Sequence, residues 1–249
     1  NPVGLREMIS RVTVAAAVDE SRPILTGVLT HLDPDAGRMM MVAADGFRLS
    51  VYESELIAPL PGPIQVIIPA RALVELSRAV TDEDEGVDVA ITDTLSQILF
   101  RTARVDLVSQ LINGTYPDHE KIMPITYNTR AVVNAKALHA TVRMASFFAR
   151  DAANVVRVTL SPGDGPDTGY IRVAAQAAEV GANRGEVEAV VEGPELEIAF
   201  NAKYLMDFLN IMGTDPVVIE CTDAGHPGLF RSTRDDGFTH VIMPMHFGP

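Results

Sequence analysis

The cations of this sequence recur at a spacing that suits contact with a phosphate backbone. Arg71 and Arg78 are seven residues apart, and so are Lys136, Arg143 and Arg150. Seven residues span nearly two turns of an α-helix, so each set would form one stripe along a helix. A stripe of Lys and Arg attracts phosphates without reading base sequence. The alternative, which stays open here, is an ordinary solvated helix face.

All five of these cations lie in segments with the apolar period of amphipathic helices. The segments are residues 4–17, 70–80, 135–150 and 202–212. The candidates for phosphate contact within them are Arg6, Arg11, Arg71, Arg78, Lys136, Arg143, Arg150 and Lys203. The same windows hold only three acidic residues. In the third segment the apolar positions fall on another face, which we expect to pack on a sheet. They are Leu138, Val142, Ala145 and Ala149.

The chain as a whole is acidic. Its 249 residues include 20 Lys or Arg and 33 Asp or Glu, a formal net charge of −13. That balance alone argues against a nucleic-acid binder, but the clustering of cations on the helices weakens the argument. Apolar residues make up 47% of the chain, and no apolar run approaches the length of a membrane span. The single cysteine, Cys221, excludes a disulfide framework, and we expect a cytoplasmic protein.

Motifs of known enzyme chemistry are missing from the sequence. It contains no Gly-rich phosphate loop, no HExxH and no GxSxG. The six histidines show no metal-ligand spacing, and the Asp33–Gly37 turn lacks the Glu that a calcium loop needs. We therefore predict a non-enzymatic protein with no cofactor and no metal. The rival hypothesis is a hydrolase-like enzyme that uses Asp45 or His119.

The helical segments are parts of an internal repeat. Equivalent positions are Leu5, Leu73, Leu138 and Leu205, at spacings of 68, 65 and 67 residues. Strand and turn signals fill the intervals, so the repeating unit is one helix followed by three or four antiparallel strands. Asn134 and Asn201 stand directly before their helices, where an N-cap is expected.

Pairs of repeating units can share one core, so four units predict two α+β domains. Each domain would have two helices on one side and two antiparallel four-stranded sheets. We expect the domains to span residues 1–126 and 127–249, because turn residues gather near that boundary. No strand signal precedes the first helix, which favours a truncated first strand and a chain that is part of a longer protein.

Six short motifs along this repeat resemble one known family. They are residues 25–27 (LTG), 44–49 (ADGFRL), 66–71 (VIIPAR), 113–118 (NGTYPD), 200–205 (FNAKYL) and 240–245 (HVIMPM). In this order, and on a repeat of this length, they resemble the bacterial beta sliding clamp, the processivity factor of the replicative DNA polymerase. The similarity covers the middle and C-terminal domains of that family and leaves out the N-terminal domain.

The resemblance implies a DNA-clamp fold and a replication function. Members are head-to-tail homodimers that encircle double-stranded DNA without sequence preference, with helices lining the hole and sheets forming the outer wall. The basic stripes would then face DNA. The other partners implied are the DNA polymerase III alpha subunit, the clamp loader and further proteins with a clamp-binding motif. No membrane contact is implied.

The family also has a peptide-binding pocket between its middle and C-terminal domains. The residues that the resemblance assigns to it are Leu25, Ala44, Gly46, Phe47, Arg48, Leu49, Pro117, Lys121, Ile122, Asn201, Tyr204, Pro227, Val241, Ile242, Met243, Pro244 and Met245. Its Leu, Ile and Met side chains would supply an adaptable apolar floor. Arg48, Asn201 and Tyr204 would orient a peptide backbone.

Three positions depart from the family pattern. His119 stands where an aromatic ring usually follows Pro-Asp. His246 and the residues after it replace the usual Arg-Leu end, and Ala153 lies where members often carry an aromatic pocket wall. The remaining alternative is a β-rich peptide-binding scaffold unrelated to DNA, in which the cations would be scattered over the surface.

Overall fold

A computed structural model describes residues 2–56, 60, 62–150, 152–165, 167–177 and 181–246. It divides into two compact units, Asn1–His119 and Glu120–Pro249. The residues after His246, where the sequence departs from the family's usual end, lie outside the described part of the chain.

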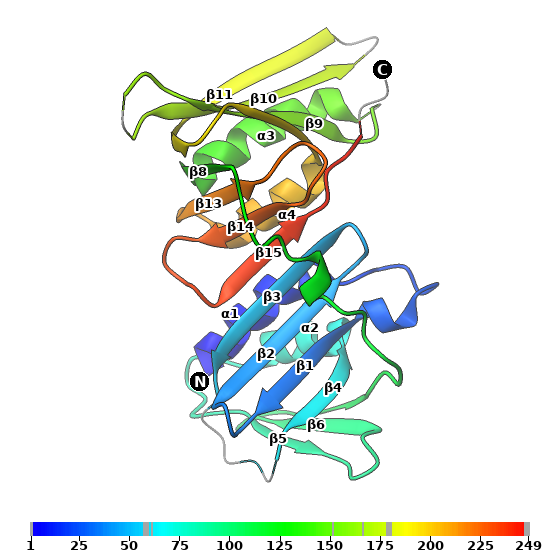
Figure 1. The fold of residues 1–249 in the computed structure, drawn as a ribbon. Helices are drawn as coiled ribbons and strands as arrows, with labels where there is room; N and C mark the ends of the chain where they lie inside the picture. Colours follow the sequence, from blue (N-terminus) through cyan, green and yellow to red (C-terminus); the bar gives the residue numbers. More distant parts are fainter. Residues whose placement is uncertain are drawn as a thin grey trace. The chain divides into compact units, whose positions relative to one another are not determined.

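The first unit packs two helices against an antiparallel sheet (Figure 1). Its elements are α1 (Pro2–Thr13), the 3-10 helix η1 (Pro23–Thr26), β1 (Gly27–Asp33), β2 (Arg38–Ala44), β3 (Arg48–Glu55), β4 (Ile64–Pro69), α2 (Ala70–Ala79), β5 (Asp88–Ile91), β6 (Gln97–Arg101) and β7 (Asp106–Gln110). One sheet has the order β3-β2-β1-β4, and β5-β6-β7 form another. The apolar faces of the helices are buried, as at Met8 and Ile9 of α1 and at Leu73 and Leu76 of α2.

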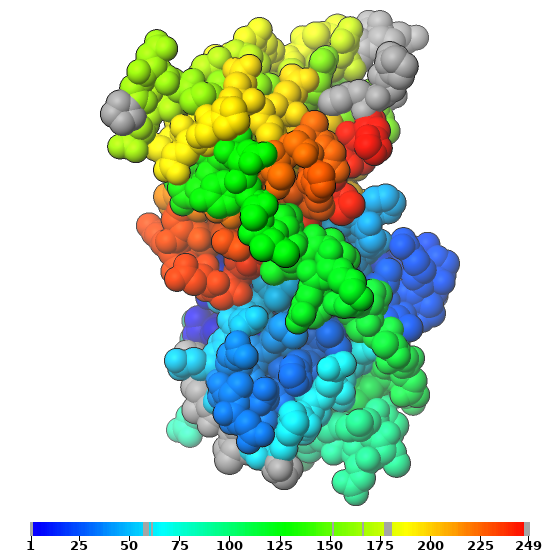
Figure 2. Space-filling model, in the orientation of Figure 1, coloured from blue at the N-terminus to red at the C-terminus, as the bar shows by residue number. Residues whose placement is uncertain are grey.

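The second unit contains one long run of eight hydrogen-bonded strands. Its elements are η2 (Glu120–Ile122), β8 (Thr129–Asn134), α3 (Ala135–Ala149), β9 (Val155–Pro162), β10 (Gly169–Ala177), β11 (Gly181–Glu192), β12 (Leu196–Asn201), α4 (Ala202–Met212), β13 (Pro216–Cys221), β14 (Gly228–Ser232) and β15 (Phe238–Ile242). The order is β12-β9-β10-β11-β8-β13-β14-β15. β11 joins the halves, because its residues up to Glu188 pair with β10 and Ala189–Glu192 pair with β8. The β10–β11 hairpin, lime to yellow in Figure 2, lies on the surface of this unit.

The order of elements repeats from one unit to the next, so the predicted α+β repeat is confirmed. The prediction of four strands in every sheet is wrong for β5-β6-β7, which has three within the described residues. In the second unit the corresponding row also includes β8, which leads directly into α3 and pairs with β13. Val89 of β5 is 48% exposed, whereas Ile219 of β13 is 2% exposed.

Side-chain caps fix the starts of both helices of the second unit. Asn134 Oδ1 accepts a hydrogen bond from Ala137 N at 3.0 Å, and Asn201 Oδ1 accepts one from Lys203 N at 2.9 Å. These bonds satisfy amides that have no partner within the helix, so the two predicted N-caps are confirmed. The predicted packing face of α3 is also confirmed by burial of Leu138, Val142, Ala145 and Ala149.

The first helix is shorter than its apolar pattern predicts. It ends at Thr13 instead of residue 17. Thr13 Oγ1 donates to Ile9 O at 2.8 Å, and Ala15 N and Ala16 N close tight turns onto Val12 O and Thr13 O. A hydroxyl that competes for a backbone carbonyl favours such an end. The following alanines still reach the core, since Ala15 is fully buried.

Aromatic rings fill the core of the second unit. The Phe208 ring of α4 lies 5.3 Å from Phe230 of β14 and 5.3 Å from His240 of β15, between ring centroids. Phe200 of β12 meets Phe230 edge-on at 5.5 Å. Such pairs stabilise a core beyond the area that they bury. They hold α4 against the sheet and so fix the helix that carries Tyr204.

Candidate functional site

The cations of the second unit lie on exposed helix surface. Lys136 and Arg143 of α3, Arg150 at its C-terminal end and Lys203 in the first turn of α4 are all exposed. The Arg150 guanidinium lies over the Phe147 ring, 5.3 Å from its centroid, a contact that keeps the positive charge. α3 itself contains no acidic residue. This helix therefore presents positive charge opposite its buried apolar face.

The cations of the first unit have different surroundings. Arg71 and Arg78 are exposed on α2, and Arg6 of α1 is half-buried. Arg11 is only 7% exposed, and its guanidinium lies 5.5 Å from the centroid of the Tyr52 ring. The assignment of Arg11 to an exposed DNA-facing stripe is therefore corrected: its side chain packs against the sheet, because Arg can bury its stem beside an aromatic ring.

A turn between β2 and β3 holds the assigned pocket residues Gly46, Phe47 and Arg48. Asp45 Oδ1 accepts hydrogen bonds from Phe47 N at 2.9 Å and Arg48 N at 3.0 Å, and Arg48 Nε donates to Asp45 Oδ2 at 3.0 Å. Gly46 has φ +92°, and a Cβ there would lie 2.9 Å from Arg22 Nη1. The positive φ favours glycine, whereas the exposed Arg22 side chain could move away from a Cβ. Arg22 is a neighbour of this turn that the motifs did not predict.

The pocket residues assigned to the first unit differ in exposure. Phe47 is 52% exposed, Leu25 is half-buried and Pro117 is exposed. Ala44 and Arg48 are buried, and Leu49 is 1% exposed, so Leu49 belongs to the core. A ligand would therefore contact Phe47 and Leu25 more readily than the buried Ala44, Arg48 and Leu49. The assignment of the whole set to one pocket stays a prediction.

In the second unit several assigned residues surround the start of α4. Met245 N donates to Ala199 O at 2.8 Å, which holds the segment after β15 beside β12. Ala202 N donates to Asn154 O at 2.8 Å, so the α3–β9 turn contacts the start of α4. That turn has φ +54° at Ala153 and +57° at Asn154, an arrangement that the sequence did not predict. L-residues adopt such values at a cost, and functional sites often hold them.

Exposure also divides the assigned residues of the second unit. Val241 is 1% and Ile242 0% exposed, so both lie in the core of the unit. Met243 is 37% exposed, and the half-buried residues are Asn201, Tyr204, Pro227, Pro244 and Met245. Lys121 and Ile122 are exposed in η2. The accessible part of this assignment is thus mostly apolar, with Lys121, Asn201 and Tyr204 as its polar members.

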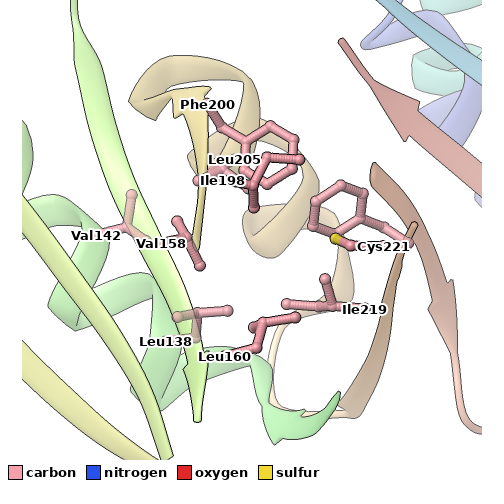
Figure 3. A pocket seen from close by; sticks show the side chains of 10 residues that line it. Leu138, Val142, Val158, Leu160, Ile198, Phe200, Leu205, Ile219 and Cys221 are labelled. Atoms are coloured by element: carbon pink, nitrogen blue, oxygen red, sulfur yellow. The ribbon is translucent and has the colours of Figure 1, made fainter. Parts of the chain in front are cut away.

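The cavity in the core of the second unit is too small for a ligand. Its volume is about 10 Å³, and side chains of α3, β9, β12, α4, β13 and β14 line it (Figure 3). Every lining side chain is apolar apart from the thiol of Cys221. A space of this size and character stays dry. Burial raises the pKa of the Cys221 thiol to about 12, so the thiol is not a nucleophile at neutral pH.

The two residues of the hydrolase hypothesis, Asp45 and His119, have different surroundings. The carboxylate of Asp45 holds the β2–β3 turn by three hydrogen bonds, and His119 is half-buried before η2. Within the described ranges, no group of three or more His, Cys, Asp and Glu could hold a metal ion. No helix in that part of the chain is long and apolar enough to cross a membrane.

Comparison with known families decides the relationship. A model of the DNA polymerase III beta subunit central domain matches residues 1–118, and a model of its C-terminal domain matches residues 120–246. The chain belongs to the DNA polymerase III beta subunit family. The beta sliding clamp of Bacillus subtilis is 32% identical over 246 residues, and that of Staphylococcus aureus strain Mu50 is 31% identical over 242. Each match covers 97% of this chain and 62% of the relative.

Solved structures give the same relationship. The crystal structure of the sliding clamp from Bacillus subtilis matches with a TM-score of 0.90 at 30% identity, over 99% of this chain and 63% of that one. A sliding clamp from Pseudomonas aeruginosa matches with a TM-score of 0.89 at 27% identity, over 99% of this chain and 65% of the other. The beta-subunit resemblance drawn from the motifs is therefore confirmed, and the chain spans about 62% of the length of the relatives that it matches.

Proposed function

We propose that the protein is a sliding clamp, a non-catalytic processivity factor that encircles duplex DNA in the cytoplasm and tethers a polymerase through a peptide pocket. The observation that carries the proposal is α3 of this beta-subunit chain: one face is buried, and the opposite face offers Lys136 and Arg143 to solvent. Contact between such a face and phosphates is independent of sequence and sensitive to salt, which suits a protein that slides.

Arg143→Glu tests the DNA contact. We expect weaker binding of a short fluorescent duplex at low salt and a shallower dependence of log K on log salt, because one phosphate contact is lost. The matched control is Arg184→Glu on β11, an exposed cation that changes the net charge equally and is ion-paired with Glu186. Equal losses in the two variants would contradict a specific contact on α3.

We also propose that the whole clamp involves a second copy and other proteins. These partners are proposals because the chain spans only 62% of the length of its relatives. The exposed apolar side chains of α3, Met144 at 55% and Phe147 at 50%, support a surface for the second copy. In a protein with the full length of the relatives, Phe147→Ser should lower the dimer fraction in sedimentation velocity. Lys136→Gln should leave it unchanged, and equal effects would remove this surface from the proposal.

A clamp-binding-motif peptide tests the pocket. The proposal predicts that a fluorescent peptide of this kind binds the wild-type chain, and that Met243→Ala/Met245→Ala weakens binding at least about tenfold, since two apolar contacts of about 1 kcal/mol each are lost. Met144→Ala, an exposed methionine of α3, is the control and should bind normally. Unchanged affinity in the double variant would exclude these methionines from the pocket. Peptide binding without any DNA binding would favour the scaffold alternative.

A further inference from the structure

Most helix cations of the first unit form ion pairs with carboxylates. Arg6 of α1 is ion-paired with Asp82 in the loop after α2, and its Nη1 also donates to Val80 O at 3.4 Å. Arg78 Nη1 of α2 lies 2.8 Å from Glu75 Oε1. Apart from buried Arg11, which is paired with Glu7 at 2.5 Å, only Arg71 of this set is left without a carboxylate partner among the described residues.

The helix cations of the second unit lack such partners. In the described part of the chain, no carboxylate forms an ion pair with Lys136, Arg143 or Lys203. α3 has no acidic residue, and Arg150 stacks on an aromatic ring that leaves its charge in place. The two helix pairs therefore carry equal numbers of candidate cations but unequal net charge at their surfaces.

A carboxylate at contact distance weakens the attraction between a cation and a DNA phosphate. At about 0.1 M salt the Debye length is about 10 Å, so a paired Arg and Asp look nearly neutral to a phosphate beyond that range. A phosphate that displaces the carboxylate leaves a like charge beside itself. An unpaired Lys or Arg attracts a phosphate at full charge and leaves no carboxylate beside it. Each one that neutralises a phosphate also releases counterions from the DNA.

We infer that Asp82 and Glu75 mask Arg6 and Arg78, so that the phosphate-contacting charge of the chain is carried mainly by α3 and the start of α4, with a contribution from the unpaired Arg71 of α2. This inference rests on the proposed DNA contact and deepens it. Two acidic residues of the run Asp82–Glu85 are ion-paired with cations elsewhere in the unit: Asp82 pairs with Arg6, and Glu83 pairs with Arg104. The loop thereby holds negative charge against the N-terminal helix.

Removal of the masking acids provides the test. Glu75→Gln/Asp82→Asn should tighten duplex binding at low salt and steepen the slope of log K against log salt by up to about 2, because two cations become free. The matched control is Glu53→Gln/Asp106→Asn, which changes the net charge equally on strands β3 and β7 of the same unit. The control should leave the slope at its wild-type value, and circular dichroism verifies that each variant folds.

A second pair of variants removes cations from each unit. Lys136→Gln/Arg143→Gln should make the slope shallower by up to about 2, whereas Arg6→Gln/Arg78→Gln should change it much less. Equal gains in the masking and control variants, or equal losses in the two cation variants, would overturn the inference while the DNA contact stands. Absence of salt-dependent binding in the wild-type chain would overturn the DNA contact itself, and the inference with it.

Discussion

Tyr116 Oη accepts a hydrogen bond from the backbone N–H of Ala44 at 2.9 Å, which joins two motifs 72 residues apart. Both groups are buried, with Tyr116 at 7% and Ala44 at 8% exposure. Burial raises the pKa of Tyr116 to about 12, so the phenol stays protonated across the physiological range. The bond ties the NGTYPD segment to the end of β2, next to the turn that carries Phe47 and Arg48.

Tyr116→Phe should therefore destabilise the first unit by about 1–3 kcal/mol, because the buried Ala44 amide loses its acceptor. Urea unfolding followed by circular dichroism measures the change. Tyr127→Phe is the control, since Tyr127 is 48% exposed, and its free energy of unfolding should stay close to wild type. Equal stability of the two variants would show that water replaces the phenol at Ala44.

The caps of the second unit give a separate prediction. Asn134→Ala and Asn201→Ala should each lower the free energy of unfolding by about 1 kcal/mol, because each removes the acceptor of an otherwise unpaired helix amide. Asn210→Ala, on the exposed side of α4, should be neutral or slightly stabilising, since alanine has the higher helix propensity. If Asn210→Ala cost as much as the cap variants, capping would not explain their effect.

The helices and most strands could be predicted because their signals are local. The buried face of α3 follows from a 3.6-residue period, and the cap at Asn134 from residue type and position. The repeat adds further support, since helix-first units recur along the whole chain. The α+β class and the candidate cations therefore follow from the sequence alone.

What the sequence could not predict depends on tertiary partners. Arg11 has the helical phase of an exposed cation, but Tyr52 lies where it can cover the guanidinium. Arg6 and Asp82 are 76 residues apart, so nothing local indicates their pairing. The left-handed backbone at Ala153 likewise has no residue signal, because alanine rarely adopts it, whereas Asn154 is of a type that is enriched there. Each difference changes which candidate side chains are accessible.

Gly193 should be far less replaceable than Gly181, although both have left-handed backbone with φ of +95° and +100°. A Cβ on Gly193 would lie 2.1 Å from Asn128 O, whereas a Cβ on Gly181 would meet nothing within 4 Å. Gly181→Ala should cost about 1–2 kcal/mol for the backbone alone. Gly193→Ala should cost about 1–3 kcal/mol more for the overlap. Thermal unfolding measures both, and similar melting temperatures would mean that the Asn128 carbonyl moves freely.

Cys221 should report on the core of the second unit. Burial holds the pKa of its thiol at about 12, above the ordinary value, so the native state keeps the proton at alkaline pH while the unfolded state releases it. Stability should therefore fall between about pH 9 and pH 12, by up to about 1.4 kcal/mol per pH unit, and Cys221→Ala should lose this slope. At pH 8, iodoacetamide should label the thiol only in denaturant. Rapid labelling of the native protein would contradict the dry core around the cavity.

The boundary between the two domains, expected at residue 126, stays a prediction that proteolysis can test. Lys121 is exposed in η2, and Ile125, four residues later, is 97% exposed, so the backbone near them should fit into a protease active site readily. Limited trypsin treatment should first cut after Lys121 and yield two resistant fragments. Arg130 lies within β8, hydrogen-bonded on both sides, and should resist. Lys121→Gln should slow the first cut, and mass spectrometry locates it. A first cut inside β1–β4 or β9–β12 would contradict a boundary here, because the segment near residue 126 would then be more protected than a sheet.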